Sequence, residues 1–179
     1  MIVLKKHALA GVMASALVML SSGSQAATDS ATVNITATVV DNTCTPEWTG
    51  AVQVAMGRAS ARDFTGEGSV GATNTFHLKM KDCGSGTTKV KVKATGTADA
   101  NTDLFKNEDA SGAAGVALAI FGDASQSTQL KPNSGEAEYD ITGNATPDLA
   151  FKAELRQSGT AAPTTGDVKS AITLTITYE

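Results

Sequence analysis

The stretch Ile172-Thr173-Leu174-Thr175-Ile176-Thr177-Tyr178-Glu179 alternates apolar and polar residues without a break. Period-two alternation indicates a β-strand with one buried and one solvent-facing side, as in antiparallel sheets. The apolar side consists of Ile172, Leu174, Ile176 and Tyr178, and the sequence ends directly after it. Exposed sheet edges recruit other strands and are normally blunted. We therefore expect an uncovered sheet edge at this strand.

A second alternating ribbon lies near the start of the chain, at residues 31–39. The residues between its apolar positions are all Thr or Asn. Nine residues at about 3.3 Å each form a ribbon of roughly 30 Å. The pattern alone leaves open whether this ribbon pairs with the C-terminal strand of its own domain or with another molecule. Its apolar residues are Ala31, Val33, Ile35, Ala37 and Val39.

Strand signals also recur between these two ribbons, whereas helix signals are nearly absent. Alternation is clear at residues 75–81, 89–94 and 149–155. The continuous apolar run Val116–Phe121 predicts a strand buried on both faces, with a short core helix as the less favoured alternative. Short strands separated by Gly-, Ser- and Asn-rich turns predict an all-β sandwich of the immunoglobulin type. Its large core residues should be Phe64, Phe76, Phe105, Phe121 and Phe151.

The first residues predict a secretory signal peptide. Lys5 and Lys6 precede the apolar run Ala8–Leu20, and Ser24-Gln25-Ala26 supplies small residues for a signal peptidase. An uncleaved membrane anchor is the alternative, but the run is shorter than the roughly 20 residues of a membrane span. We expect a signal peptide at 1–26, an N-terminal arm at 27–40 and one domain at 41–179.

The charge and the two cysteines narrow the class of protein further. Removal of Lys5 and Lys6 with the leader changes the formal net charge from −4 to −6. An acidic domain without a basic cluster argues against nucleic acid or an anionic membrane as a partner. In an oxidising compartment Cys44 and Cys83 should form a disulfide. Two free thiols, or a metal site that includes His77, are the alternatives.

Residues that could carry chemistry have simpler explanations. Gly66, Gly68 and Gly71 match the dinucleotide-binding pattern, but a strand rather than a helix should follow them, so a surface loop is favoured. His77 should lie on the solvent side of a strand, without the partners that a catalytic triad or a metal site needs. We therefore predict no catalytic residue, no metal site and no cofactor.

The spacing of two groups of charged residues is typical of solvent-exposed strand faces. Glu136 and Glu138 share one side of a strand, which suits a solvated face better than a pair of glycosidase carboxylates. Lys89, Lys91 and Lys93 form a basic stripe that could protect an edge strand, contact a subunit or bind a ligand.

Together these features resemble the chaperone–usher family of Gram-negative pilus subunits, in particular type 1-like shaft pilins. The resemblance covers essentially all of the chain after the leader. No single motif is specific, but the combination of a leader, an alternating arm, a spaced cysteine pair and a penultimate tyrosine is. The segments that carry it are Ala31–Cys44, Met80–Cys83, Ala153–Asp167 and Ile172–Glu179.

The resemblance implies an incomplete immunoglobulin-like β-sandwich that a donor strand from another subunit completes. The arm would place Ala31, Val33, Ile35, Ala37 and Val39 in a neighbour's groove, although the family commonly has glycine where Ala37 aligns. Ile172, Leu174, Ile176 and Tyr178 would line the groove and contact a periplasmic chaperone. An outer-membrane usher and identical or related pilus subunits are the other implied partners.

The expected function is therefore that of a structural subunit of a cell-surface fimbria, secreted through the periplasm. It would polymerise by donor-strand exchange and support adhesion. A soluble secreted or periplasmic immunoglobulin-like binding module is the alternative. An enzyme is the weakest hypothesis, because the sequence supplies no catalytic constellation.

Overall fold

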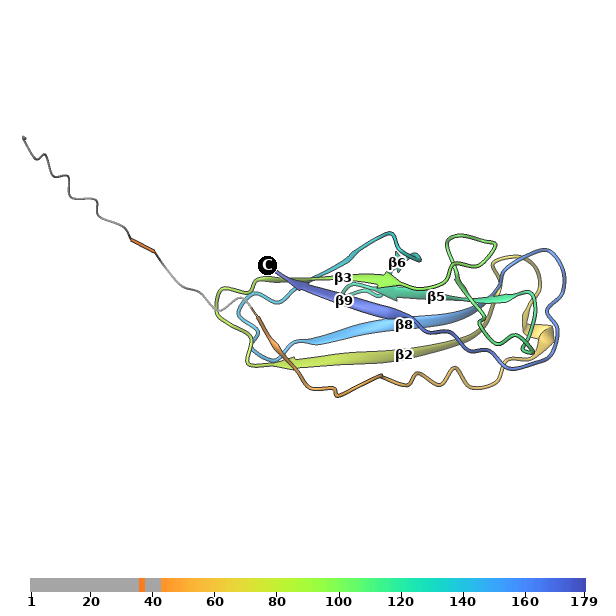
Figure 1. Ribbon diagram of the computed structural model, residues 1–179, viewed down its shortest axis with the longest axis horizontal. Coiled ribbons are helices and arrows are strands. Elements are labelled where there is room, and N and C mark those ends of the chain that lie inside the picture. Colours follow the sequence, from red (N-terminus) through yellow and green to blue (C-terminus); the bar gives the residue numbers. More distant parts are fainter. Residues whose placement is uncertain (1–35, 38–42) are drawn as a thin grey trace, which may run out of the picture. The chain divides into compact units, whose positions relative to one another are not determined.

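The computed structural model describes residues 36–37 and 43–179. The chain divides into two compact units, Met1–Ala37 and Thr38–Glu179, and the fold described here is that of the second. It consists of strands and one short 3-10 helix, which confirms the expected all-β class (Figure 1). Among the described residues, no helix is long and apolar enough to cross a membrane. The elements are β1 (Thr45–Pro46), η1 (Ala61–Asp63), β2 (Val70–Lys81), β3 (Lys89–Thr95), β4 (Phe105–Lys106), β5 (Val116–Gly122), β6 (Thr128–Leu130), β7 (Ala137–Asp140), β8 (Asp148–Gln157) and β9 (Thr173–Tyr178).

The strands form two antiparallel sheets that enclose the main core. The larger sheet has the order β1-β2-β8-β5-β4, and β6 also pairs with β5. The smaller sheet has the order β7-β3-β9. β9 is therefore an edge strand, and its register on β3 runs from Thr95 opposite Thr173 to Val90 opposite Tyr178. The alternation at the C-terminus predicted this strand correctly.

The main core lies between the two sheets and contains most of the predicted large residues. Phe105 and Phe151 are fully buried there. Phe76 is half-buried, and its ring stacks on that of Phe151 with 5.1 Å between the centroids. Phe64 is also half-buried and packs against the same core. Large apolar residues therefore concentrate where the two sheets face each other.

Phe121 is buried, as predicted, but it lies outside this main core. It belongs to a separate cluster with Leu104, Ala117 and Ala119. The cause is the two-residue period of a strand: 117, 119 and 121 share one side of β5, whereas Val116, Leu118 and Ile120 share the side that faces the main core. Both sides are buried, so the continuous apolar run forms the predicted doubly buried strand.

Charged side chains of β8 cover the Phe121 ring. Lys152 Nζ lies 4.5 Å and Arg156 Cζ lies 5.2 Å from the ring centroid. The Glu154 carboxylate pairs with both cations, at 3.0 Å from Lys152 Nζ and 2.5 Å from Arg156 Nη2. The buried Glu154 carboxylate therefore has two cationic partners in place.

An extended segment follows β1 and runs along the outer side of β2 (Figure 1). Glu47 N–H donates to the Lys79 carbonyl oxygen at 3.0 Å, and Asn74 Nδ2 donates to the Ala55 carbonyl oxygen at 2.7 Å. The paired strand β1 itself has only two residues. This wall of the sandwich is thus held by few main-chain hydrogen bonds.

Gly122 permits the close approach of β5 to the smaller sheet. A Cβ atom at this position would lie 2.7 Å from Ala137 Cβ and 3.0 Å from Tyr139 Oη. We expect Gly122→Ala to lower the free energy of unfolding by about 1–3 kcal/mol, because the surrounding core must shift. Urea unfolding measures this change. Gly159→Ala is the control, since its Cβ would meet no atom within 4 Å; equal effects of both substitutions would contradict the packing argument.

The predicted disulfide between Cys44 and Cys83 is present. It closes a loop with a sequence separation of 39 and joins the start of the domain to the end of β2. The double substitution of both cysteines by serine should lower the free energy of unfolding by about 4 kcal/mol, because the unfolded chain gains conformational freedom. Chemical denaturation with and without reductant tests this. Reductant should destabilise the unsubstituted protein and leave the double variant unchanged.

Candidate functional site

The edge strand β9 has a row of apolar side chains that its own domain covers only in part. This row, called the C-terminal row, consists of Ile172, Leu174, Ile176 and Tyr178, and all four residues are half-buried. The facing positions on the partner strand β3 are Val90, Val92 and Ala94, with relative exposures of 0%, 0% and 1%.

Both rows pack against the same core. The difference arises because β3 has a strand on each side, whereas β9 has a strand on one side only.

The second edge of β9 presents main-chain hydrogen-bonding groups. Glu179 and Lys89 exchange two hydrogen bonds of 2.9 Å, so they form a hydrogen-bonded pair at the end of the ladder. In an antiparallel ladder such pairs alternate with pairs whose peptide groups point away. The N–H and C=O groups of Leu174, Ile176 and Tyr178 therefore point away from β3. Within residues 43–179, β9 pairs with no other strand, so these groups have no ladder partner there.

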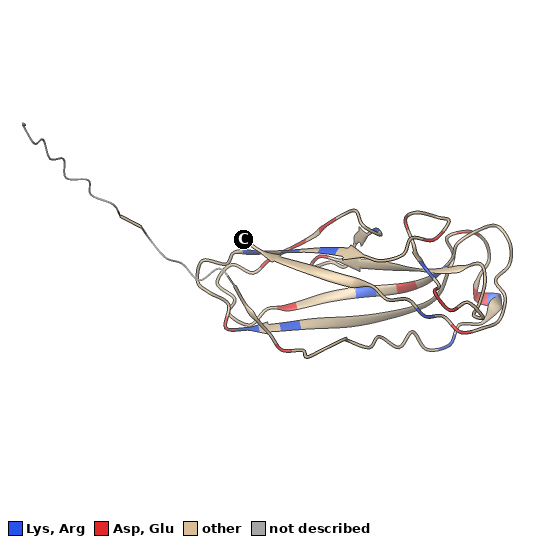
Figure 2. Cartoon of the chain, viewed as in Figure 1, with Lys and Arg blue, Asp and Glu red and all other residues tan. Residues whose placement is uncertain are grey.

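β9 also lacks the charged residues that usually protect an edge strand. Its residues Thr173–Tyr178 include no Lys, Arg, Asp or Glu, and Figure 2 shows it without a charged segment. Natural edge strands commonly carry charges, prolines or bulges that prevent pairing with another chain. β9 has an unbroken register and none of these features. It therefore has the properties of an edge that accepts a strand.

A second group of half-buried apolar residues borders the larger sheet. Trp48, Val54 and Met56 belong to the extended segment after β1, and Ala72 and Phe76 belong to β2. Each packs against the main core without being fully covered by it. Sequence reasoning missed the contribution of residues 48–56, because this segment has few ladder bonds and only a short alternating pattern.

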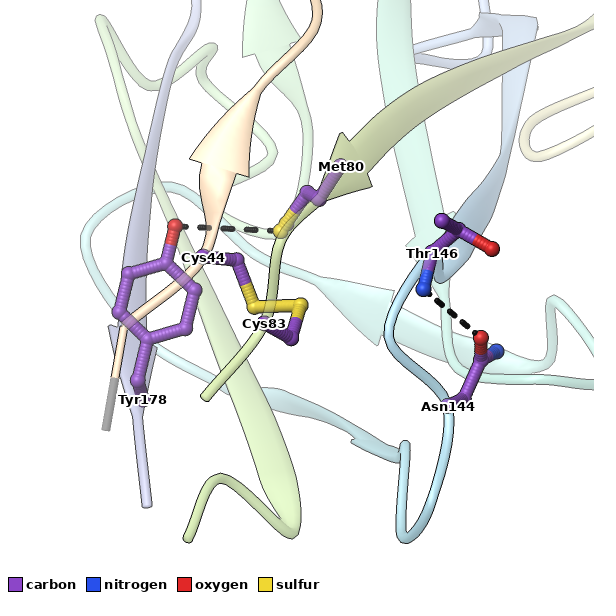
Figure 3. Close-up of a disulfide and its surroundings, with 6 residues drawn as sticks. All are labelled: Cys44, Met80, Cys83, Asn144, Thr146 and Tyr178. Atoms are coloured by element: carbon purple, nitrogen blue, oxygen red, sulfur yellow. Dashed lines mark hydrogen bonds between the residues drawn. A yellow bond between two sulfur atoms is a disulfide. The ribbon is translucent and has the colours of Figure 1, made fainter. Parts of the chain in front are cut away.

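Tyr178 connects the C-terminal row to the larger sheet. Its hydroxyl group donates to Met80 Sδ at 3.8 Å, next to the Cys44–Cys83 disulfide (Figure 3). Burial raises the pKa of Tyr178 above its ordinary value of 10.0, so the phenol stays protonated at neutral pH. The start of the domain therefore lies beside the C-terminal end of β9.

The lysine stripe on β3 is neutralised by carboxylates of the same face. Lys89 Nζ lies 2.5 Å from Glu138 Oε1, and Lys91 Nζ lies 2.7 Å from Glu179 Oε1. Lys93 Nζ lies 3.3 Å from Glu136 Oε2.

The hydrogen bond from Lys89 holds the pKa of Glu138 below its usual range, so this carboxylate is ionised at neutral pH. These groups form a solvent-exposed ladder of ion pairs, which confirms the interpretation of Glu136 and Glu138 as a solvated face.

The other sequence candidates also have structural roles. His77 is exposed, as predicted, and its Nδ1 lies 3.0 Å from Asp148 Oδ1. The glycine-rich loop precedes β2 rather than a helix, and Gly66 N–H donates to Gln157 Oε1 at 3.1 Å. That amide thus binds the loop's own domain instead of a phosphate. In the part of the chain that the structure describes, no three His, Cys, Asp or Glu residues are grouped as metal ligands would be.

Most of the predicted donor row lies outside the described residues. This holds for Ala31, Val33, Ile35 and Val39, and Ala37 is exposed. The signal peptide at residues 1–26 also lies outside them. The arm and the leader therefore remain predictions.

Comparison with known proteins gives consistent relatives. The model of the fimbrial protein family matches residues 33–179. The S-fimbrial protein subunit SfaG of Escherichia coli O6:K15:H31 (strain 536 / UPEC) is 30% identical over 150 residues, which cover 82% of this chain and 82% of that protein. The Burkholderia pseudomallei antigen and type I fimbria protein BPSL1626 has a crystal structure that is similar to this one. It is 27% identical, with a TM-score of 0.57, over 73% of this chain and 84% of that chain.

A further solved structure shares the fold. A chain from the structure of a chaperone–usher pilus aligns with a TM-score of 0.62 at 18% identity, over 87% of this chain and 99% of that chain. The two-sheet fold agrees with these matches. The chain belongs to the fimbrial protein family and is a structural subunit of a cell-surface pilus that is exported through the periplasm.

Proposed function

We propose that this subunit polymerises by donor-strand exchange, in which β9 accepts the arm of another copy. The observation that carries the proposal is the free edge of β9, which combines unpaired peptide groups, a half-buried apolar row and no charge. Strand addition to an exposed sheet edge uses main-chain hydrogen bonds for affinity and side-chain pockets for register. Chaperone–pilin donor-strand complementation is an established example of this kind of recognition.

The arm at residues 31–39 has the pattern that such an edge requires. Its alternating apolar residues would enter the half-buried region, and its Thr and Asn residues would face solvent. Burial of a Val or Ile side chain contributes about 1.5–3 kcal/mol relative to exposure. The apolar residues of the arm are Ala31, Val33, Ile35, Ala37 and Val39.

Chain connectivity favours donation to another molecule. The domain begins at Cys44, which lies at the Tyr178 end of β9. To pair antiparallel with its own β9, the arm would have to place Val39 near the opposite end of a site about 30 Å long. The residues from Val39 to Cys44 reach about 18 Å at most. A self-docked arm would therefore have to run parallel to β9, whereas an arm from another copy can run antiparallel.

The route to the fibre follows from the same edge. We infer that a periplasmic chaperone covers β9 before assembly and that an outer-membrane usher is the place where an incoming arm replaces it. Cleavage of the leader after Ala26 would free residues 27–40 as the donor arm. In the assembled fibre, each subunit would then accept one arm and donate another.

Ile35→Asp tests the donor role of the arm. The substitution should place an unpaired charge in an apolar site, and we expect fibre formation to fall by at least about 100-fold. Electron microscopy and gel analysis of unboiled fibres measure the result. Thr36→Asp is the matched control, because residue 36 has the opposite parity and its side chain should face solvent. Normal fibres from the Ile35→Asp variant would refute the donor assignment.

Deletion of residues 27–40 separates donation from acceptance. The truncated chain should still bind its chaperone and should accept one arm from an intact subunit, but it should not form homopolymers. Mixing it with intact subunits should shorten the fibres, because each truncated chain ends a fibre. If truncation instead unfolds an otherwise stable monomer, the arm completes its own domain and the proposal fails.

A further inference from the structure

The segment that precedes β9 is fixed by a different part of the chain. β9 begins at Thr173, but residues 167–171 are already held by Asn107–Ala113, which we call the clasp. Two main-chain hydrogen bonds connect them. Glu108 N–H donates to the Lys169 carbonyl oxygen at 2.7 Å, and Ala113 N–H donates to the Asp167 carbonyl oxygen at 2.9 Å.

Side chains of the clasp bind further main-chain groups of this segment. Asn107 Oδ1 accepts from Lys169 N–H at 2.9 Å, and Asn107 Nδ2 donates to the Asp167 carbonyl oxygen at 3.0 Å. Glu108 Oε2 accepts from Ala171 N–H at 2.8 Å.

Glu108 is ionised at neutral pH. The Thr97 hydroxyl and the Ala171 N–H hold its pKa below the ordinary value. Five hydrogen bonds thus replace the strand ladder here: two join main-chain groups, and three involve the side chains of Asn107 and Glu108.

The contact between the two segments is close because glycines form part of it. A Cβ atom on Gly112 would lie 2.2 Å from the Asp167 carbonyl oxygen, and one on Gly166 would lie 2.4 Å from Ala113 N. Both distances are too short for a side chain. The backbones of the two segments therefore approach each other too closely for a side chain at either position.

The clasp binds the odd-numbered residues of the segment, and β3 binds the odd-numbered residues of β9. Asp167, Lys169 and Ala171 use their peptide groups toward the clasp. Thr173, Thr175 and Thr177 use theirs toward β3, as the Glu179–Lys89 pair requires. The even-numbered residues therefore present their peptide groups along one continuous edge. Their side chains form one half-buried row, which consists of Val168, Ser170, Ile172, Leu174, Ile176 and Tyr178.

We propose that the strand-accepting site extends beyond β9 to Val168, and that the clasp is the element that positions this extension. The inference rests on the proposed function and adds residues to it. β9 alone supplies three row positions, Leu174, Ile176 and Tyr178, whereas the arm has five alternating apolar residues. Six residues of β9 span about 20 Å, but the arm needs about 30 Å. Residues 168–172 supply the missing length.

Peptide binding to a chain that accepts but cannot donate tests this inference. The acceptor is the mature chain with Ile35→Asp, refolded from urea with a dye-labelled peptide of residues 31–39. Fluorescence anisotropy gives the Kd of this peptide and of two shortened peptides, residues 34–39 and residues 31–36. In the antiparallel arrangement, Ala37 and Val39 lie over the extension, and the peptide of residues 31–36 lacks both. With an intact clasp we expect the peptide of residues 31–36 to bind at least tenfold more weakly than the full peptide.

Glu108→Ala removes the clasp contact with Ala171 and should raise the Kd of the full peptide at least tenfold. The peptide of residues 31–36 does not reach the extension, so its Kd for this variant and its Kd for the acceptor with an intact clasp should agree within twofold. That agreement also shows that β9 remains folded. Lys169→Ala is the matched control. It removes the ion pair between Lys169 and Asp109. The Lys169 side chain is 72% exposed and such pairs contribute little, so every Kd should change less than twofold.

Ser170→Asp provides an independent variant in case Glu108→Ala does not fold. It leaves the clasp contacts of residues 167, 169 and 171 in place and puts a charge in the row. Only peptides that reach the extension should lose affinity. If the full peptide binds tightly and neither variant changes its Kd, the extension is refuted and the proposed function stands. If no peptide binds the acceptor with an intact clasp, donor-strand exchange itself is refuted.

Discussion

The structure depends on the one-sided pairing of β9. A strand within a sandwich can satisfy its peptide groups and bury its side chains only when it has neighbours on both edges. β9 has β3 on one edge and, among the described residues, no strand on the other. Its apolar row is consequently half-buried, while the facing row of β3 is fully buried. In the proposed donor-strand exchange, this imbalance leaves binding energy for the contact between subunits.

The remaining structure keeps β9 in place without covering its free edge. The clasp and the ladder with β3 hold the same side of residues 167–179. The contact of the Tyr178 hydroxyl with Met80 Sδ holds the C-terminal end against β2. A site that is rigid before binding loses less conformational entropy when a strand arrives. The fold therefore separates the groups that position the edge from the groups that would recognise the arm in the proposed exchange.

Sequence patterns predicted the strands well where local alternation was strong. This holds for the final strand and for residues 75–81, and the continuous apolar run Val116–Phe121 was also predicted correctly as a doubly buried strand. Phe121 is a core residue, as predicted, but its place in a second cluster was not predicted, because alternation gives the two sides of a strand but not the layer that covers each side. The contribution of the extended segment after β1 was missed for a related reason. Its residues are held by single hydrogen bonds to β2 rather than by a ladder with a readable period.

The sequence by itself determined the class of fold, the disulfide and the apolar face of the last strand, because each depends on residue spacing or on residue count. Only the tertiary structure decided which edge of that strand is free and how far the edge continues. The clasp joins Asn107 and Glu108 to residues about 60 positions later, and no local pattern specifies such a contact. Hydrogen-bond direction along β9 likewise follows from its register on β3, which exists only after the chain has folded.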